Sequence, residues 1–150
     1  MRSNLKKVLG RVGIAAALVL PMTAWSANHT INVGQLPGGG QGNSFNDPST
    51  DTHTTNAAVG DTITFNNVGA APGFHNVRSD GPVTTFRCAN GCDGAGGDGS
   101  PSSTNWTATI TLTAADTINY YCEIHGAPGQ GMFGTINVTT PVELQSFDVE

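Results

Sequence analysis

The chain has 150 residues, of which 11% are charged, and its 6 basic and 11 acidic side chains give a formal net charge of −5. This length suits a single domain with one hydrophobic core. An acidic surface repels nucleic acid and anionic lipid, so the composition excludes both as partners.

The segment 1–26 has the layout of a bacterial-type secretory signal. Four basic residues precede an apolar run over 12–20, and the segment ends in the small-x-small pattern Ala24-Trp25-Ser26. The apolar run is shorter than the roughly 20 residues that span a bilayer. We therefore expect cleavage after Ser26 or Ala27, and a periplasmic or secreted protein with no membrane span over residues 27–150.

Loss of that segment makes the protein more acidic. It removes four of the six basic residues and leaves Arg78 and Arg87 against eleven acidic residues, a net charge of −9. A surface of this kind favours a basic partner that docks electrostatically, and it also keeps an exported protein soluble.

After residue 27 the sequence indicates strands and shows no sustained helical period. Over 105–112, Trp106 and Ala108 share one face with two further apolar residues, and three threonines share the other, as in a half-buried strand. Residues 62–65 repeat this alternation. Short strands separated by turns predict an all-β sandwich of about seven to eight strands. The other strands are expected at 30–33, 76–78, 117–122, 134–139 and, less clearly marked, 143–149.

Two glycine-rich stretches, 36–43 and 92–103, contain too little apolar surface to form a core, and we expect both to be surface loops. There is no internal repeat and no second domain. The tail over 141–150 is either one more strand or a loose end.

Three cysteines in an exported chain leave one without a partner in the same chain. Cys88 and Cys92 flank a short segment with the turn-forming pair Asn90-Gly91, so we expect a disulfide between them. Because its ring is small, this bond would contribute about 2 kcal/mol. Cys122 remains as a free thiol, and metal ligation is a good reason to keep one.

The segment around Cys122 contains further metal ligands. His125 and Met132 follow it closely, and His75 from the middle of the chain completes a set of one Cys, two His and one Met. A trigonal group of one thiolate and two imidazoles, with a weak axial thioether, is what a blue-copper electron-transfer site requires. Cys122 has the same strand parity as Ile118 and Tyr120, so all three should point into the core. His125 should reach the site from the loop beyond that strand.

The motifs that surround these ligands resemble those of the cupredoxins, the type 1 blue copper proteins, with the pattern of plastocyanin and pseudoazurin. They occur in the family's order and cover about residues 30–138. The resemblance implies a Greek-key β-sandwich that forms one copper-binding domain over 27–150 and holds one copper ion, Cu(I) or Cu(II). The motifs are Gly60-Asp61-Thr62-Ile63-Thr64-Phe65 with Asn67, Phe74-His75-Asn76-Val77, Tyr121-Cys122 with His125, and Gly131-Met132-Phe133-Gly134.

The spacing of the axial ligand departs from the family. Six residues separate His125 from Met132, whereas plastocyanin-like proteins have four between the corresponding residues. Alignment on the strand that follows makes Met132 axial and puts an insertion in the loop, whereas alignment on His125 puts Gln130 in the axial position. We expect Met132, because the loop must end where the next strand begins, with Gln130 as the alternative.

The resemblance also implies roles for residues beside the ligands. Asn76, which follows the first histidine, would tie its loop to the cysteine's loop by hydrogen bonds. An apolar patch around His125, which includes Phe74 and Pro128, would be where a redox partner docks. His29 and His53 lie near the start of the mature chain and in a polar loop, and we expect both to be solvated rather than ligating.

Three functions remain open at this point. The first is carriage of single electrons between redox proteins, such as a basic cytochrome or oxidoreductase, by a monomer that is not an enzyme. Copper storage or delivery could use the same ligands. An immunoglobulin-like adhesion domain is the weakest reading, because no cysteine between Ala27 and Arg87 could pair with Cys122 across such a sandwich.

Overall fold

The computed structural model describes residues 25–68 and 73–141. Most of the predicted signal segment, and the strand expected over 143–149, lie outside these residues. All ten regular elements of the described part are strands. Within that part, no helix is long and apolar enough to cross a bilayer.

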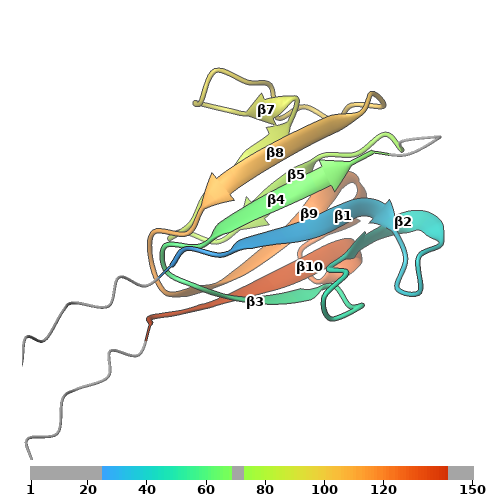
Figure 1. Cartoon of the computed structure of the whole chain (residues 1–150). Coiled ribbons are helices and arrows are strands. Elements are labelled where there is room, and N and C mark those ends of the chain that lie inside the picture. Colours follow the sequence, from blue (N-terminus) through green and yellow to red (C-terminus); the bar gives the residue numbers. More distant parts are fainter. Residues whose placement is uncertain (1–24, 69–72, 142–150) are drawn as a thin grey trace, which may run out of the picture.

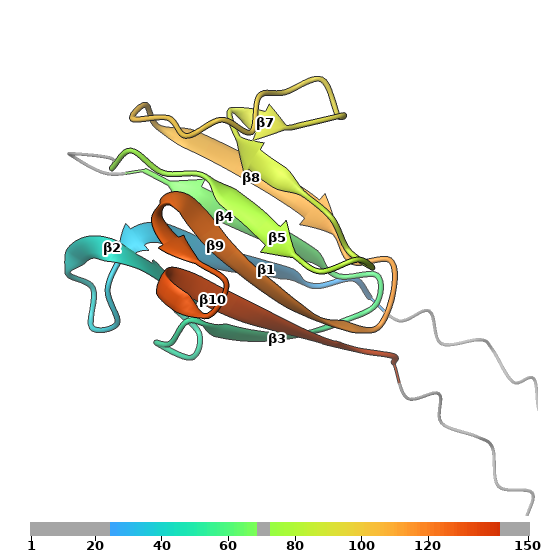
Figure 2. The ribbon, with the colours of Figure 1, turned by 180° about the vertical axis from the view of Figure 1, so that it is seen from behind.

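The strands form two sheets that pack face to face (Figure 1). The four-stranded sheet has the order β2-β1-β4-β8, and the six-stranded sheet has the order β3-β10-β9-β5-β6-β7. β1 runs parallel to β4, and β3 runs parallel to β10, while the other neighbours are antiparallel. Figure 2 shows the six-stranded sheet from its outer side. The bounds are β1 Asn28–Gln35, β2 Gln41–Asn46, β3 Thr54–Ala58, β4 Thr62–Asn67, β5 Val77–Asp80, β6 Arg87–Ala89, β7 Gly91–Cys92, β8 Trp106–Thr111, β9 Asp116–Ala127 and β10 Gln130–Thr139.

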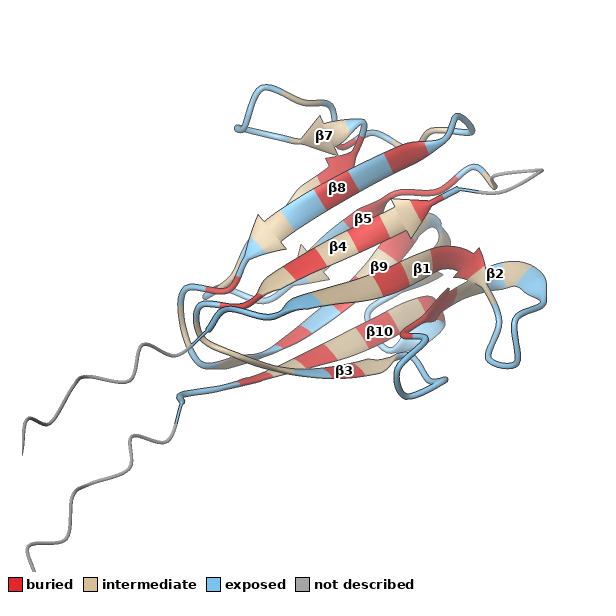
Figure 3. Cartoon of the chain, in the orientation of Figure 1, coloured by how far each residue is buried: buried red, intermediate tan, exposed pale blue. Residues whose placement is uncertain are grey.

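Alternating side chains explain why these segments form a sandwich. Along β4 and β8, buried and more exposed residues alternate with a period of two, which Figure 3 shows as changes of colour along each strand. On β9, Ile118, Tyr120 and Cys122 are buried together, so the predicted parity of this strand is confirmed. The all-β sandwich is confirmed as well.

The predicted number of strands was too low. β3 buries only Thr55, and β7 has just two residues, so neither carries the apolar alternation that marks a strand in the sequence. Both form because a neighbouring strand offers its free edge: β3 pairs with β10, and β7 pairs with β6. Strand formation here depends on sheet pairing more than on local sequence.

The glycine-rich stretch 36–43 is also only partly a loop, because β2 begins at Gln41. The fully buried Phe45 fixes β2 against the core, and Leu36 lies over Gly42. A Cβ atom at Gly42 would come within 2.7 Å of the Leu36 side chain, so a larger residue there would displace Leu36. The glycine that looked like a loop residue therefore lies on β2 beneath the side chain of Leu36.

The core lies between the two sheets and is built around aromatic rings. Phe45 and Phe65 from the four-stranded sheet both pack edge-on against Tyr120 of β9, with ring centroids 4.9 and 5.4 Å apart. Burying side chains of this size stabilises the fold by about 1.5–3 kcal/mol each. Met132 and Cys122 belong to the same buried cluster, so the sulfur atoms of the predicted site lie in the core.

Candidate metal centre

Two strands and one bridged segment position the predicted ligands. His75 lies just before β5, where its backbone N–H donates to the carbonyl of Ser102 (3.2 Å) and its carbonyl accepts from the N–H of Ser102 (3.0 Å). This two-bond bridge fixes the backbone of His75 although it lies outside a strand. Cys122 and His125 lie on β9, and Met132 lies on β10.

The β9–β10 hairpin brings the last three ligands together through an irregular register. Gly131 pairs with Gly126 and Phe133 pairs with Tyr121, so residues 122–125 of β9 face Met132 alone on β10. The longer segment of β9 bulges from the ladder and leaves room for side chains to turn toward one point. The extra residues of β9 in this bulge therefore hold Cys122 and His125 opposite Met132.

The position of His125 corrects one prediction. His125 was expected in a loop beyond the strand, but β9 continues to Ala127. Strand pairing resumes at Gly126 because Pro128-Gly129 forms the tight connection, and Gly129 has a φ of 71°. Proline followed by a positive-φ glycine is the combination that a type II turn favours.

The structure brings the ligand atoms of His75, Cys122 and His125 to within 4.8 Å of one another. The sulfur of Cys122 lies 3.8 Å from Nδ1 of His75 and 3.6 Å from Nδ1 of His125, and the two Nδ1 atoms are 3.1 Å apart. A triangle with these sides has a circumradius of about 2.0 Å, close to metal–nitrogen and metal–sulfur bond lengths of about 2.0–2.3 Å. The three atoms are thus spaced to hold one transition-metal ion.

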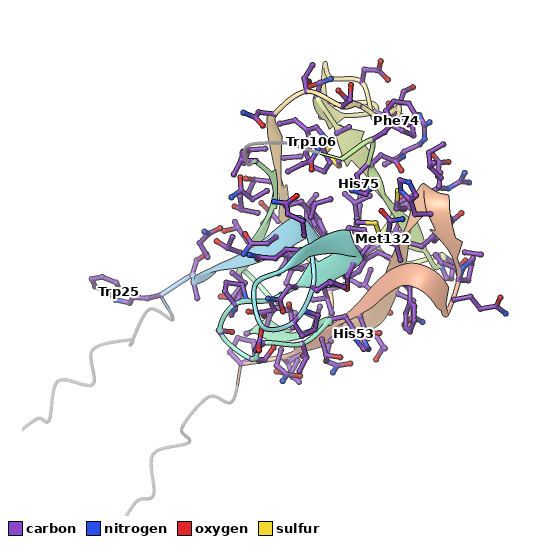
Figure 4. All side chains as sticks on the ribbon, turned by 90° about the vertical axis from the view of Figure 1, so that its right-hand side faces the viewer. Trp25, His53, Phe74, His75, Trp106 and Met132 are labelled. Carbon is purple, nitrogen blue, oxygen red and sulfur yellow. A yellow bond between two sulfur atoms is a disulfide. The ribbon has the colours of Figure 1, made fainter. Side chains whose placement is uncertain are left out.

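Burial distinguishes the two candidates for the axial position. Met132 is fully buried, whereas Gln130 is exposed where β10 begins, next to the hairpin turn. In Figure 4, His75 and Met132 are labelled close together near the middle of the view. Since only Met132 faces the Cys122 segment across the ladder, the arrangement favours its thioether over the Gln130 amide.

His75 is held in a neutral state by its surroundings. Its side chain is almost fully buried, and this burial, together with the nearby His125 ring, lowers its pKa from 6.5 to about 4. Gly34 and Gly73 make room for the imidazole, because a Cβ atom would lie 3.0 Å from Nε2 at Gly34 and 2.1 Å from it at Gly73. A neutral imidazole with a free lone pair is the form that binds a metal.

Asn76 makes the contacts that the resemblance implied. Its Oδ1 accepts the backbone N–H of Glu123 at 3.0 Å, and its Nδ2 donates to the carbonyl of Gly99 at 2.9 Å and to the Glu123 carboxylate at 2.7 Å. The side chain is fully buried. It therefore ties the residue after His75 to the residue after Cys122, and both ligands are anchored by one amide.

Glu123 is a residue that the sequence analysis missed. Its carboxylate accepts hydrogen bonds from Arg78 (2.8 Å) and Arg87 (2.7 Å) in addition to that from Asn76. Burial raises the pKa of Glu123, but the hydrogen bonds from Arg78, Arg87 and Asn76 outweigh it, so the pKa lies below its usual value. Arg78 and Arg87 are the only Lys or Arg residues after residue 26, but no local pattern in the sequence marks Glu123 as their shared partner.

The remaining cysteines and histidines take other roles. Cys88 and Cys92 form the predicted disulfide between β6 and β7, and Cys122 is free and buried. His53 is exposed, as expected. His29 differs from its expectation: its Nε2 lies 3.0 Å from the Asp61 carboxylate, and its side chain is 24% exposed, so it is hydrogen-bonded rather than simply solvated.

The donor set has a definite chemical preference. One thiolate, two imidazoles and one thioether suit copper, since the soft sulfur ligands favour the cuprous ion and imidazole suits both oxidation states. A trigonal arrangement of Cys and two His with a weak Met is the geometry of blue-copper sites. The residues present therefore fit copper.

Comparisons with known proteins gave matches in structure only. No protein-family model and no curated protein sequence matches the chain. Its structure is similar to pseudoazurin from Methylobacterium extorquens AM1, with 19% identity, 75% of each chain covered and a TM-score of 0.46. It is also similar to a purple cupredoxin from Nitrosopumilus maritimus (16% identity, 73% of this chain and 97% of that chain, TM-score 0.43). Plastocyanin from Dryopteris crassirhizoma is a further similar structure, with 20% identity, 73% and 98% coverage and a TM-score of 0.42.

Proposed function

We propose that the chain is a small exported copper protein that carries single electrons between redox partners. One observation supports this most strongly: the thiol sulfur of Cys122 and the imidazole nitrogens of His125 and the distant His75 lie 3.1–3.8 Å apart, and the buried Met132 faces the Cys122 segment across the ladder. Bound copper would supply one-electron chemistry by changing between its cuprous and cupric states.

The protein residues would hold the ion in nearly the same geometry in both states. His75 is buried and neutral, and Met132 is buried on a paired strand. Asn76 and Glu123 link the backbones that carry His75 and Cys122, so we propose that they fix the orientation of these ligands. A site that changes little between oxidation states needs little rearrangement when an electron arrives or leaves.

His125 would be the contact point for redox partners. It is the one nitrogen ligand that is not fully buried, and Phe74 (49% exposed) and Ile124 (54% exposed) each precede a ligand histidine in sequence. Apolar side chains beside an accessible ligand allow a partner to dock close to the metal. With a net charge of −9 after residue 26, a basic partner is favoured, and we propose a monomer.

Export accounts for the cysteine chemistry. A disulfide persists in an oxidising compartment, and the Cys88–Cys92 bond is of this kind. Together with the signal-like segment 1–26, it supports a periplasmic or secreted location. The same bond does not fit an immunoglobulin-like domain, because it joins neighbouring strands of one sheet and leaves Cys122 free.

Copper delivery is the alternative with the same ligands, and exchange rates distinguish the two. A delivery protein must release its ion readily, whereas three buried ligands favour retention. Purified protein loaded with cuprous ion should lose little metal to a competing chelator within the time in which an exposed site empties. Fast and complete loss would favour delivery and contradict the proposed role.

Addition of cupric ion to the purified, metal-free protein tests copper binding itself. The expected result is an intense blue colour, because a thiolate bound to cupric ion in a trigonal site absorbs strongly in the visible. A colourless product in folded protein would contradict the proposal.

A further inference from the structure

We propose that removal of the segment 1–26 creates a second metal site, for Cu²⁺ or Ni²⁺, from the new amino terminus Ala27-Asn28-His29. It is independent of the His75 site and depends on cleavage after Ser26, one of the two expected positions. Its ligands would be four nitrogens: the free amine of Ala27, the backbone amides of Asn28 and His29, and the His29 imidazole.

The covalent structure of such a terminus suits a square-planar ion. Bonding through the amine and the next two amide nitrogens closes two five-membered rings, and the imidazole Nδ1 of a third-position histidine closes a six-membered ring. On binding, the terminal ammonium and the two amides each release one proton, and the neutral imidazole donates its lone pair. Planar nitrogen coordination selects Cu²⁺ or Ni²⁺ among divalent ions.

The structure leaves the required nitrogen of His29 available. His29 uses Nε2 to contact the Asp61 carboxylate at 3.0 Å, and within the described residues Nδ1 has no hydrogen-bond partner. A carboxylate that holds one imidazole nitrogen fixes the tautomer and leaves the lone pair on the other. Asp61 therefore presents Nδ1, the nitrogen nearer the backbone, as the metal-binding atom.

Asp61 also brings the future amine close to the imidazole. Its Oδ1 accepts the backbone N–H of Ala27 at 2.8 Å, while its Oδ2 contacts His29. The two terminal ligands of the site thus meet on one carboxylate before any ion binds. Once cleavage turns the Ala27 nitrogen into an amine, the neighbouring carboxylate also offsets part of the charge of a bound cation.

Binding requires the first residues of β1 to separate from β4. Asn28 pairs with Thr62 and His29 pairs with Ile63, and the backbone N–H of Thr62 donates to the Ala27 carbonyl at 2.9 Å. Ala27 and Asn28 are exposed and His29 is half-buried, whereas the first fully buried residue of β1 is Ile31. The strand end can therefore open without exposing the core.

The two metal sites would lie at opposite ends of β1. The strand runs from Asn28 to Gln35 within the four-stranded sheet, as Figure 1 shows, and Gly34 near its end borders the imidazole of His75. Gly34 lies five positions after His29, a span of about 17 Å in an extended strand. The sites share no ligand and can be tested separately.

The test uses exported protein with its signal removed, in a Cys122→Ser background that lacks the predicted blue site. Mass spectrometry should show a chain that begins at Ala27. Titration with Ni²⁺ should then give one equivalent bound, with the visible spectrum of a square-planar nitrogen site. A chain that begins at Asn28 would overturn the proposal, because His29 would then be the second residue of the mature chain and not the third.

Two variants of that protein and one control complete the test. One extra glycine before Ala27 moves His29 to the fourth position and should weaken Ni²⁺ binding at least 100-fold without altering any side chain. His29→Gln should do the same, and His53→Gln should bind like the parent. Equal binding by the extended variant, or no binding by the parent, would overturn the proposal.

Discussion

The two ends of the sandwich assemble metal ligands in opposite ways. At one end, His75 lies 47 residues before Cys122 in the sequence, and the two meet only because β5, which follows His75, pairs with β9. At the other, Ala27 and His29 are near neighbours in sequence, and folding only orients them through Asp61. The first site therefore depends on the tertiary structure, whereas the second depends on the covalent chain and on proteolysis.

Loss of the thiolate should have the largest effect. Cys122→Ser should abolish the blue colour completely, because no other side chain at the first site supplies a thiolate. Visible absorption after addition of one equivalent of cupric ion measures this, with parent and variant both in a His29→Gln background so that the second site takes up no copper. The matched control replaces both Cys88 and Cys92 by serine, which should lower the free energy of unfolding by about 2 kcal/mol but leave the colour unchanged. A blue Cys122→Ser protein would show that the thiolate is wrongly assigned.

Unfolding should affect the two metal sites differently. In urea, the colour of the His75 site should disappear together with the tertiary structure, because His75 lies 47 residues from Cys122 and only the fold brings them together. Ni²⁺ bound at Ala27-Asn28-His29 should remain, since those residues need no fold to chelate it. Visible spectra of both loaded proteins across the same urea range give the comparison, and simultaneous loss of both signals would contradict it.

Filling the space around the His75 imidazole should have the next largest effect, on both stability and copper retention. Gly73→Ala would place a methyl group where the imidazole lies, since the Cβ atom would be 2.1 Å from Nε2. We expect a loss of about 1–3 kcal/mol in the free energy of unfolding and weaker copper retention. Gly81→Ala, where a Cβ atom meets nothing within 4 Å, is the control and should behave like the parent. Equal effects of the two substitutions would rule out the proposed steric role.

Acid should destabilise the metal-free protein through His75. Its pKa is about 4 in the folded state and 6.5 in the unfolded state, so the unfolded state binds more protons between these values. The contribution of His75 to the free energy of unfolding should therefore be fully present above pH 6.5 and be lost as the pH drops toward 4. Urea unfolding at several pH values measures this, and a His75→Asn variant should lose this part of the slope. An unchanged slope in the variant would assign the effect to other groups.

The axial ligand should have the smallest effect. Met132→Gln should keep the blue colour and lower the reduction potential, because an amide oxygen favours the cuprous state less than a thioether does. Voltammetry of the copper-loaded protein measures the shift. Gln130→Ala is the matched test of the alternative, and a larger shift there than at Met132 would make Gln130 the axial residue.

The sequence predicted the parts of this fold that depend on local alternation. β4, β8 and the parity of Cys122 on β9 followed from side chains that repeat every two residues. β3 and β7 did not, since pairing with a neighbouring strand creates them. Parity alone also could not bring His75 to Cys122, and only the family resemblance supplied that step.

The surroundings of the site were harder to predict than its ligands. The contacts of Glu123 with Arg78 and Arg87 depend on the register that pairs Arg78 with Tyr121 across β5 and β9, and no local pattern reports a register. The role of Gly73 depends on the position of the His75 imidazole, two residues later in the sequence, which folds back against it. His29 was misjudged because its partner Asp61 lies 32 residues away.

X-ray absorption at the copper edge tests the central claim most directly. The sample is His29→Gln protein loaded with one equivalent of copper, so that only the His75 site is occupied. The expected inner shell contains one sulfur and two imidazole nitrogens, as the convergence of Cys122, His75 and His125 requires. An inner shell of nitrogen and oxygen alone would contradict it.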